Sequence, residues 1–256
     1  MTPDTPESRR PRGVYLLPNL FTTAALFCGF YAIIAALNSR FEPAAIAVFI
    51  AMVLDGLDGR VARLTHTESE FGAQYDSMAD LVSFGLAPAL IMYEWALGTM
   101  AGMGPFLSKL GWLAAFFYTV MAALRLARFN VQLGSADKRY FIGLPSPSAA
   151  AILAGLVWFS TDLGLTGVQM LWPALIVTIG AGALMFSNIL YLSFKQVDLR
   201  GPVPFMAVLI IVLIFVFTSI DPPKVLFFGF LFYGLSGPAL FLWRWRRHSR
   251  RQAGNP

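Results

Sequence analysis

The sequence DGLDGRVARLTHTESEFGAQYDSMAD, residues 55–80, places four aspartates in a short polar stretch between two apolar segments. Asp55 and Asp58 are three residues apart, and Asp76 and Asp80 are four apart. Side chains at these spacings lie on one face of a helix. Carboxylates near membrane depth are costly unless a cation, a partner or water compensates their charge. We therefore expect two helices that bring the four aspartates to a divalent-metal site close to a membrane surface.

The composition is that of a helical membrane protein. Hydrophobic residues make up 57% of the 256 residues and charged residues only 13%, and the mean hydropathy is +0.65. A soluble domain carries about a quarter charged residues. The apolar segments are long and continuous, whereas a membrane-spanning barrel would show alternation over roughly ten residues. The single cysteine, Cys28, excludes a disulfide framework within one chain and fits a small buried hydrophobic residue.

Eight apolar segments are predicted to cross the membrane. Their approximate bounds are 16–37, 42–58, 72–97, 110–131, 146–161, 170–193, 203–220 and 224–243. The second segment is short for a complete crossing, and its helix is expected to continue to about Leu64. The pattern predicts an all-α fold, a polytopic membrane helix bundle.

The basic residues predict the orientation of the chain in the membrane. With the N-terminus inside, sixteen of the nineteen Lys and Arg residues fall on inner segments, and only Arg40, Lys109 and Lys224 fall outside. Because cytoplasmic loops are the ones enriched in Lys and Arg, we expect both termini and the aspartate cluster on the cytoplasmic side. The basic run RWRRHSRR, residues 244–251, fits an orientation signal that rests on anionic lipid, so we expect no nucleic-acid binding.

Small residues share the predicted helix faces with the aspartates. Gly59 and Ala62 follow the first aspartate pair, and Gly72 precedes the second pair. Carboxylate oxygens suit hard cations such as Mg²⁺ or Mn²⁺, and small residues let a bulky ligand approach the backbone. Arg63 follows on the first helix and can pair with phosphate oxygens. Since two metal ions can clamp a diphosphate and stabilise the attacking and leaving oxygens, the pattern indicates phosphoryl-type transfer on an anionic substrate.

The aspartates also fit two alternative roles, which stay open at this point. They fit solvated charge at the membrane interface, and they fit the ion pathway of a metal-ion transporter. A transporter more often spreads its ligands over several central helices, whereas these four lie in one helix–loop–helix at one edge of the bilayer. Ion flux without release of a nucleotide would distinguish the transporter from the enzyme.

The fixed positions of the segment resemble a known signature. From Asp58 to Asp80 the sequence follows D-G-x-x-A-R, eight residues, then G-x-x-x-D-x-x-x-D, with Asp55 three residues earlier. This segment resembles the CDP-alcohol phosphotransferases at every fixed position. The resemblance implies a six-helix membrane core, usually homodimeric. It also implies an enzyme that cleaves the diphosphate of a CDP-linked substrate, releases CMP and joins the phosphoryl group to an alcohol.

The resemblance further implies roles for single residues. The metal ligands would be Asp55, Asp58, Asp76 and Asp80, and Asp80 would also act as the catalytic base. The groups that contact the CDP moiety or its phosphates would be Gly59, Ala62, Arg63 and Gly72. The implied cofactor is Mg²⁺ or Mn²⁺, as two ions.

The same resemblance divides the chain into four parts. A cytoplasmic N-terminal tail (1–15) precedes a six-helix catalytic core (16–200), which two additional transmembrane helices (201–243) and a basic cytoplasmic tail (244–256) follow. The expected fold is thus a six-helix core plus two C-terminal helices.

Three further segments resemble the bacterial membrane-type phosphatidylserine synthases, a branch of this family. They are LPNLFTTAALFCGFYA (Leu17–Ala32), RLARFN (Arg125–Asn130) and YFIGLPSPSAA (Tyr140–Ala150). The resemblance implies an enzyme of the bacterial inner membrane with CDP-diacylglycerol and L-serine as substrates. A serine carboxylate needs a cationic fork, and its other groups need hydrogen-bond partners. The side chains that suit this acceptor are Arg125, Arg128, Asn130, Ser146 and Ser148.

These acceptor residues also fit ordinary structural roles. Arg125 and Arg128 fit positive-inside anchoring by snorkelling, and GLPSPS (143–148) fits a turn that starts a helix. The same chemistry with glycerol 3-phosphate, inositol or choline as acceptor therefore remains an alternative. A phosphorylated acceptor would need a denser basic pocket than two arginines supply.

Overall fold

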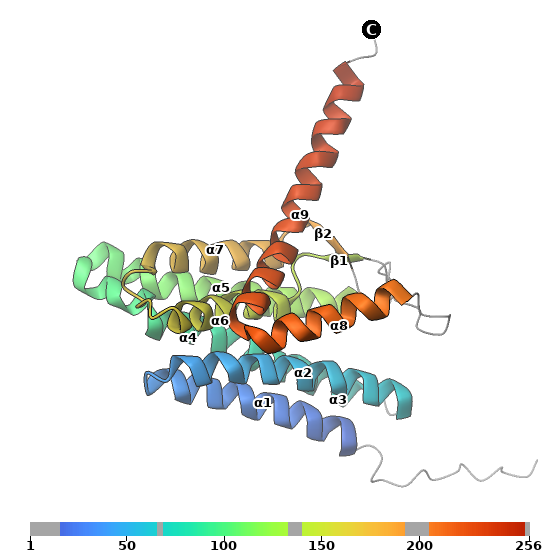
Figure 1. Ribbon diagram of the computed structural model, residues 1–256, viewed down its shortest axis with the longest axis horizontal. Coiled ribbons are helices and arrows are strands. Elements are labelled where there is room, and N and C mark those ends of the chain that lie inside the picture. Colours follow the sequence, from blue (N-terminus) through green and yellow to red (C-terminus); the bar gives the residue numbers. More distant parts are fainter. Residues whose placement is uncertain (1–15, 66–68, 133–139, 193–204, 254–256) are drawn as a thin grey trace, which may run out of the picture.

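A computed structural model describes residues 16–65, 69–132, 140–192 and 205–253 (Figure 1). Within these ranges the fold is a bundle of helices with one short pair of strands. In chain order the elements are α1 (Leu16–Leu37), α2 (Phe41–Thr65), α3 (Glu70–Asp80), the π-helical segment η2 (Leu81–Leu86), α4 (Ala87–Trp95), the 3-10 segment η3 (Leu97–Met103), α5 (Pro105–Gln132), β1 (Tyr140–Ile142), α6 (Ser146–Asp162), α7 (Leu171–Phe186), β2 (Leu190–Leu192), α8 (Phe205–Ile220) and α9 (Pro222–Ala253).

The predicted apolar segments locate most of these helices. The first coincides with α1, and α2 runs past the short second segment to Thr65, as expected. The third segment is not one regular helix, since α3, η2 and α4 succeed one another along it. The Gly-rich stretch after it forms η3, and the chain bends by 41° there. At the other end of the chain, the backbone of α9 stays helical to Ala253.

The described residues are mostly helical, as predicted, apart from one short pair of strands. β1 and β2 form an antiparallel pair, with Tyr140 opposite Leu192 and Ile142 opposite Leu190. The segment predicted as a span over 170–193 is therefore helical only to Phe186 and ends as a strand. Runs of three residues are too short to show a helical or an alternating period, so the sequence pattern could not reveal this pairing.

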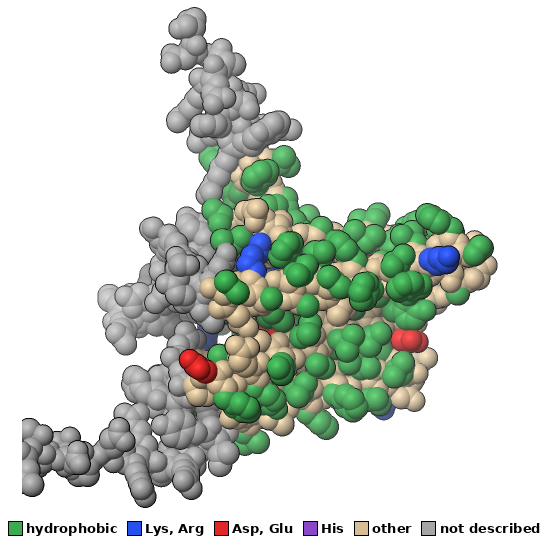
Figure 2. All heavy atoms as spheres, turned by 180° about the vertical axis from the view of Figure 1, so that it is seen from behind, with side chains coloured by type: hydrophobic (Ala, Val, Ile, Leu, Met, Phe, Trp, Pro, Cys, Tyr) green, Lys and Arg blue, Asp and Glu red, His purple; other side chains and the backbone are tan. Residues whose placement is uncertain are grey.

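The described helices support a membrane protein. Three of them are long and apolar enough to span a bilayer: Asn19–Leu37, Pro105–Val131 and Pro222–Trp243. The bent pair Glu70–Trp95 and Leu97–Met103 adds a fourth if it forms one broken span. Among the described residues, hydrophobic side chains cover much of the surface in Figure 2, and charged side chains occupy only isolated places. The count of eight spans, six of them in a core, stays a prediction.

Small side chains let α1 and α2 pack closely together. Ala32 and Ala36 of α1 and Ala44 and Ala51 of α2 are almost completely buried in the core. Close backbone approach through small residues is how helices associate where lipid offers no hydrophobic driving force. This packing fixes α2, the helix that carries the first aspartate pair.

The π-helical segment η2 follows directly after the second aspartate pair, and neighbouring helices hold it. Pro88 has no N–H and cannot donate to the carbonyl four residues before it, that of Phe84. The hydroxyl of Tyr118, from α5, donates to this carbonyl over 3.0 Å. The hydroxyl of Ser83 donates to the Ala25 carbonyl of α1 over 3.1 Å. Such π-helical turns often lie at functional sites, and here α1 and α5 both stabilise it.

Replacing Tyr118 with Phe tests the bond that holds this turn. Tyr118 is fully buried, so the variant leaves the Phe84 carbonyl without this donor in an apolar interior. An unsatisfied buried group costs about 1–3 kcal/mol, and we expect Tyr118→Phe to lower the free energy of unfolding by that amount. Denaturant unfolding of the purified protein in detergent micelles measures the change. An unaltered stability would show that the carbonyl finds another donor.

Candidate active site

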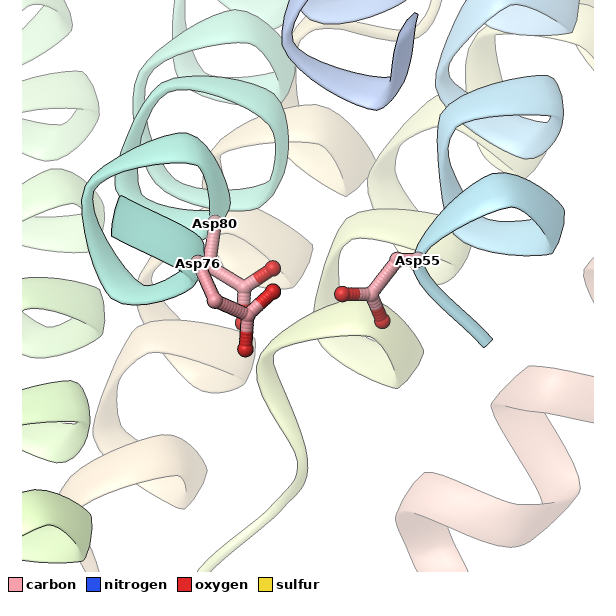
Figure 3. Close-up of side chains that lie close together, drawn as sticks. All are labelled: Asp55, Asp76 and Asp80. Carbon is pink, nitrogen blue, oxygen red and sulfur yellow. The ribbon is translucent and has the colours of Figure 1, made fainter. Parts of the chain in front are cut away.

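Three carboxylates converge from two helices. Asp55 projects from α2, while Asp76 and Asp80 project from α3 toward it (Figure 3). One carboxylate oxygen of each residue lies within 4.8 Å of those of the other two. The spacing of four residues puts Asp76 and Asp80 on one face of α3, as the sequence predicts. An all-oxygen donor set of this kind fits a hard divalent cation such as Mg²⁺ or Mn²⁺.

Asp58 lies beside this group of three and has a partner of its own. Its side chain is buried, and Oδ2 accepts a hydrogen bond from Thr22 Oγ1 of α1 over 2.8 Å. Nothing in the sequence singles out Thr22, because a lone hydroxyl in an apolar helix carries no motif. The bond ties the first aspartate pair to α1 and fixes the direction of the Asp58 side chain.

A cavity of about 540 Å³ opens beside the carboxylates, and all four aspartates line it. α5 and the start of α6 line it too, and they contribute Arg125 and Ser146. Leu126 and Phe129 add apolar surface. The motif search missed these two residues, because an apolar side chain in a membrane helix looks the same whether it faces lipid or a cavity. Four carboxylates, the two arginines Arg60 and Arg125, and some apolar surface thus line one cavity.

Arg125 is built into the cavity wall. Only 9% of the residue is exposed, and Nη1 donates to Oγ of the fully buried Ser146 over 2.6 Å. Burial beside the cavity differs from the snorkelling position of an arginine that only anchors a helix end. A buried guanidinium held in this way suits a carboxylate or a phosphate.

The remaining three predicted acceptor residues do not line this cavity. Arg128 Nη2 donates to the Ile142 carbonyl over 2.8 Å. Asn130 Nδ2 donates to Ser77 Oγ over 3.0 Å. Ser148 is buried near the start of α6. Direct contact of these three side chains with an acceptor stays a prediction.

Of the predicted CDP-contact residues, one lines the cavity and one does not, and the other two have side chains outside the described part of the structure. Gly59 lines the cavity, and a Cβ atom added there would meet nothing within 4 Å. The same holds for Gly56, which sequence reasoning missed although it lies between two aspartates. Gly72 is outside the lining, and its amide donates to the side chain that caps α3. Ala62 and Arg63 continue the α2 helix, but their side chains lie outside the described part of the structure.

Comparison with known proteins identifies the family. The model of the CDP-alcohol phosphatidyltransferase family matches residues 15–180. The chain belongs to the CDP-alcohol phosphatidyltransferase family. The match includes the four aspartates, Arg125 and Ser146, and it confirms the family predicted from the signature. Helices α8 and α9 lie beyond it.

Three similar proteins within this family have the same name. A Helicobacter pylori (strain ATCC 700392 / 26695) protein named CDP-diacylglycerol–serine O-phosphatidyltransferase is 35% identical over 224 residues, 87% of this chain and 90% of that protein. A Mycobacterium leprae (strain TN) protein of the same name is 32% identical over 219 residues, 84% of this chain and 69% of that protein. A third, from Bacillus subtilis (strain 168), is 34% identical over 180 residues, 70% of this chain and 92% of that protein.

The three converging carboxylates repel one another when no cation is bound. Asp55→Asn removes one of the three charges, so we expect it to raise the unfolding temperature in EDTA by about 2–4 °C. Added Mg²⁺ or Mn²⁺ should stabilise the unaltered protein more than it stabilises this variant. Thermal unfolding in detergent, with EDTA or with metal, measures both effects.

Glu94→Gln is the matched control, because Glu94 is an exposed carboxylate on α4 outside the group of three. It should alter neither value. Equal stabilisation of Asp55→Asn and the unaltered protein by metal would contradict a cation site built on these carboxylates.

Proposed function

We propose that this protein transfers the phosphatidyl group of CDP-diacylglycerol to L-serine and produces phosphatidylserine and CMP. The observation that carries the proposal is the cavity, because four aspartates and a buried arginine line the same space. The family supports the reaction type, and the names of the relatives support the two substrates. An acidic wall suits a metal-bound diphosphate, and a buried guanidinium suits an acceptor that carries a carboxylate.

The four aspartates are the proposed metal ligands. Asp55, Asp76 and Asp80 would hold a divalent cation, and Asp58 would complete a site for two ions, Mg²⁺ or Mn²⁺. The converging carboxylate oxygens support this assignment, because hard cations prefer such donors. When bound, the metal supplies stabilisation of the negative charge on the phosphate oxygens and on the leaving group.

Asp80 is the proposed general base. Its carboxylate lines the cavity and accepts the proton of the serine hydroxyl. The hydroxyl oxygen attacks the phosphorus atom that is bonded to diacylglycerol, and a new P–O bond forms. The bond from that phosphorus to the bridging oxygen breaks, so CMP leaves with the electron pair. The proton on Asp80 then passes to solvent, and the carboxylate is ready for the next acceptor.

The donor occupies the α2 side of the cavity in this proposal. Gly56 and Gly59 leave the helix backbone open, so a CDP group has room to lie against it. Ala62 and Arg63 follow on the same helix, and Arg63 would pair with a phosphate oxygen. Gly72 would approach the same group from the start of α3.

Arg125 is the proposed ligand of the serine carboxylate. Its guanidinium is already oriented by Ser146, so little side-chain freedom is lost on binding. Arg128, Asn130 and Ser148 would support this pocket without contacting the acceptor. Arg128 and Asn130 already hydrogen-bond to other protein groups.

The proposed setting is the cytoplasmic face of the bacterial inner membrane. The apolar spans and the distribution of basic residues support it. With eight spans and both termini inside, serine and CMP would exchange with the cytosol, and the donor lipid would enter from the inner leaflet. A homodimer is part of the proposal by analogy with the family.

A release assay over several alcohols tests the acceptor. The purified protein receives CDP-diacylglycerol in mixed micelles, Mg²⁺ or Mn²⁺, and L-serine, glycerol 3-phosphate, inositol or choline. We expect CMP release that depends on serine and gives phosphatidylserine, with Asp80→Asn lowering the rate about 10²–10⁴-fold while the fold persists. CMP release with another alcohol and not with serine would replace the acceptor. Ion flux without CMP release would favour a transporter.

Arg125→Lys tests the acceptor pocket. Lysine keeps the positive charge but lacks the planar fork that matches a carboxylate. We expect the KM for L-serine to rise about tenfold or more, with little change in the KM for CDP-diacylglycerol. Steady-state kinetics with each substrate varied in turn measures both constants. Arg60→Lys is the control for the KM for L-serine. Arg60 lines the same cavity but lies on α2, away from the proposed acceptor pocket, so this change should not raise that KM. An equal rise of both KM values in Arg125→Lys would mean that Arg125 serves the fold and not the acceptor.

A further inference from the structure

A proline in α9 leaves one helix carbonyl free to accept a hydrogen bond from another element. Pro238 lies inside this helix and has no N–H, so it cannot donate to the carbonyl four residues before it, that of Gly234. The hydroxyl of Tyr191, in β2, donates to this carbonyl over 2.9 Å in a buried position. In an apolar surrounding the carbonyl has no water to turn to, so the bond ties α9 to β2.

The side chains around this bond fit closely. Tyr191 is 1% exposed, and its ring centroid lies 5.6 Å from that of Tyr233 on α9. A Cβ atom added at Gly237 would lie 2.4 Å from Cζ of Tyr191. Glycine is therefore required where α9 meets the ring, because any side chain would push the two elements apart.

The strand β2, which carries Tyr191, contacts the segment that leads to the cavity residue Ser146. Tyr191 lies opposite Phe141 in the β1–β2 pair. The chain leaves β1 through Gly143, whose N–H donates to the Ile189 carbonyl over 2.8 Å. The next amide, of Leu144, donates to the Leu184 carbonyl over 2.9 Å. These bonds tie the segment just before Ser146 to the end of α7 and to the residue just before β2.

Two features prevent this segment from shifting on its own. Gly143 has a φ of +82°, and a Cβ atom there would lie 2.2 Å from the Met185 carbonyl oxygen. Arg128 donates to the carbonyls of Ile142 and Met185 over 2.8 and 3.3 Å. These contacts join β2 to the segment that leads to Ser146, whose hydroxyl accepts a hydrogen bond from Arg125 in the cavity wall.

We propose that α9 is a positioning element for the acceptor side of the cavity, and that Tyr191 is the positioning residue through which it acts. The helix, which Figure 1 shows at the C-terminal end of the chain, lies beyond the segment that the family model matches. Tyr191 does not line the cavity, and it acts through β1, Ser146 and Arg125. The inference rests on the proposed function in one respect, since it assigns Arg125 to the acceptor.

A pair of glycine variants in α9 tests the docking. Gly237→Ala places a methyl group against the Tyr191 ring, whereas Gly229→Ala is a matched control, because a Cβ atom there meets nothing within 4 Å. We expect Gly237→Ala to raise the KM for L-serine about 3–10-fold, with kcat and the KM for CDP-diacylglycerol changed far less. Gly229→Ala should leave all three constants unchanged.

A double-variant cycle tests the hydrogen bond itself. Tyr191→Phe removes the donor to the Gly234 carbonyl and should raise the KM for serine. Pro238→Ala restores a backbone N–H that can donate to the same carbonyl. In the Pro238→Ala background, Tyr191→Phe should therefore have a smaller effect than in the unaltered protein. Independent, multiplicative effects of the two changes would contradict the role of this bond.

Hydrogen–deuterium exchange of the full chain in detergent gives a readout that needs no activity. In Gly237→Ala the amides of Gly143 and Leu144 should exchange faster than in Gly229→Ala. Equal exchange in the two variants would overturn the proposal, and so would faster exchange with an unchanged KM for serine. Absence of serine-dependent activity in the unaltered protein would instead overturn the proposed function, while the exchange result would still decide whether α9 positions the segment.

Discussion

Gathering three carboxylates within 4.8 Å of one another is the constraint on which the rest of the structure depends. Like charges at this separation repel, and partial burial makes each charge more costly still. The helices that carry them must therefore be held from outside the site. The buried alanines of α1 and α2 fix one helix, and the Thr22–Asp58 bond fixes its polar end. The capped start of α3 and the π-helical turn after it fix the other helix.

At two places a tyrosine hydroxyl donates to a helix carbonyl that a proline leaves without its usual donor. Each proline leaves a helix carbonyl without its usual donor, and a tyrosine from another element supplies one, Tyr118 at Phe84 and Tyr191 at Gly234. In lipid such a carbonyl has no water to bond to, so each bond also specifies which elements must meet. The first bond involves Phe84, which follows Asp80 in η2. The second involves Tyr191 of β2, the strand that pairs with β1 just before the loop to Ser146. Both boundaries of the cavity thus depend on a local irregularity that is completed by a distant hydroxyl.

The sequence predicted the acidic half of the site well and the other half in part. The spacing of four residues is local, so it predicted that Asp76 and Asp80 share one face of α3. All four aspartates were expected to meet, and the structure brings Asp55, Asp76 and Asp80 together, with Asp58 in the same cavity but bonded to Thr22. The limits of α1 and α6 followed from apolar length and from polar or Gly- and Pro-rich breaks, whereas the third segment and the segment predicted over 170–193 were not single helices. The β1–β2 pair was missed because it joins two very short runs far apart in the chain. The carbonyl contacts of Arg128 were missed for a different reason: no side-chain motif reports where a backbone oxygen will be.

This difference between the two halves bears on how acceptor choice arises. The acidic wall is encoded within one helix–loop–helix, so a short signature can describe it throughout the family. The part with Arg125 comes from α5, the loop after β1 and the start of α6. The end of α7 hydrogen-bonds this loop, and in our proposal α9 supports it through Tyr191. Its shape can change through substitutions in any of these elements while the signature stays intact. If Arg125 binds the acceptor as proposed, the fit of the acceptor depends on tertiary contacts, and a residue as remote from the reacting atoms as Gly237 affects how serine binds.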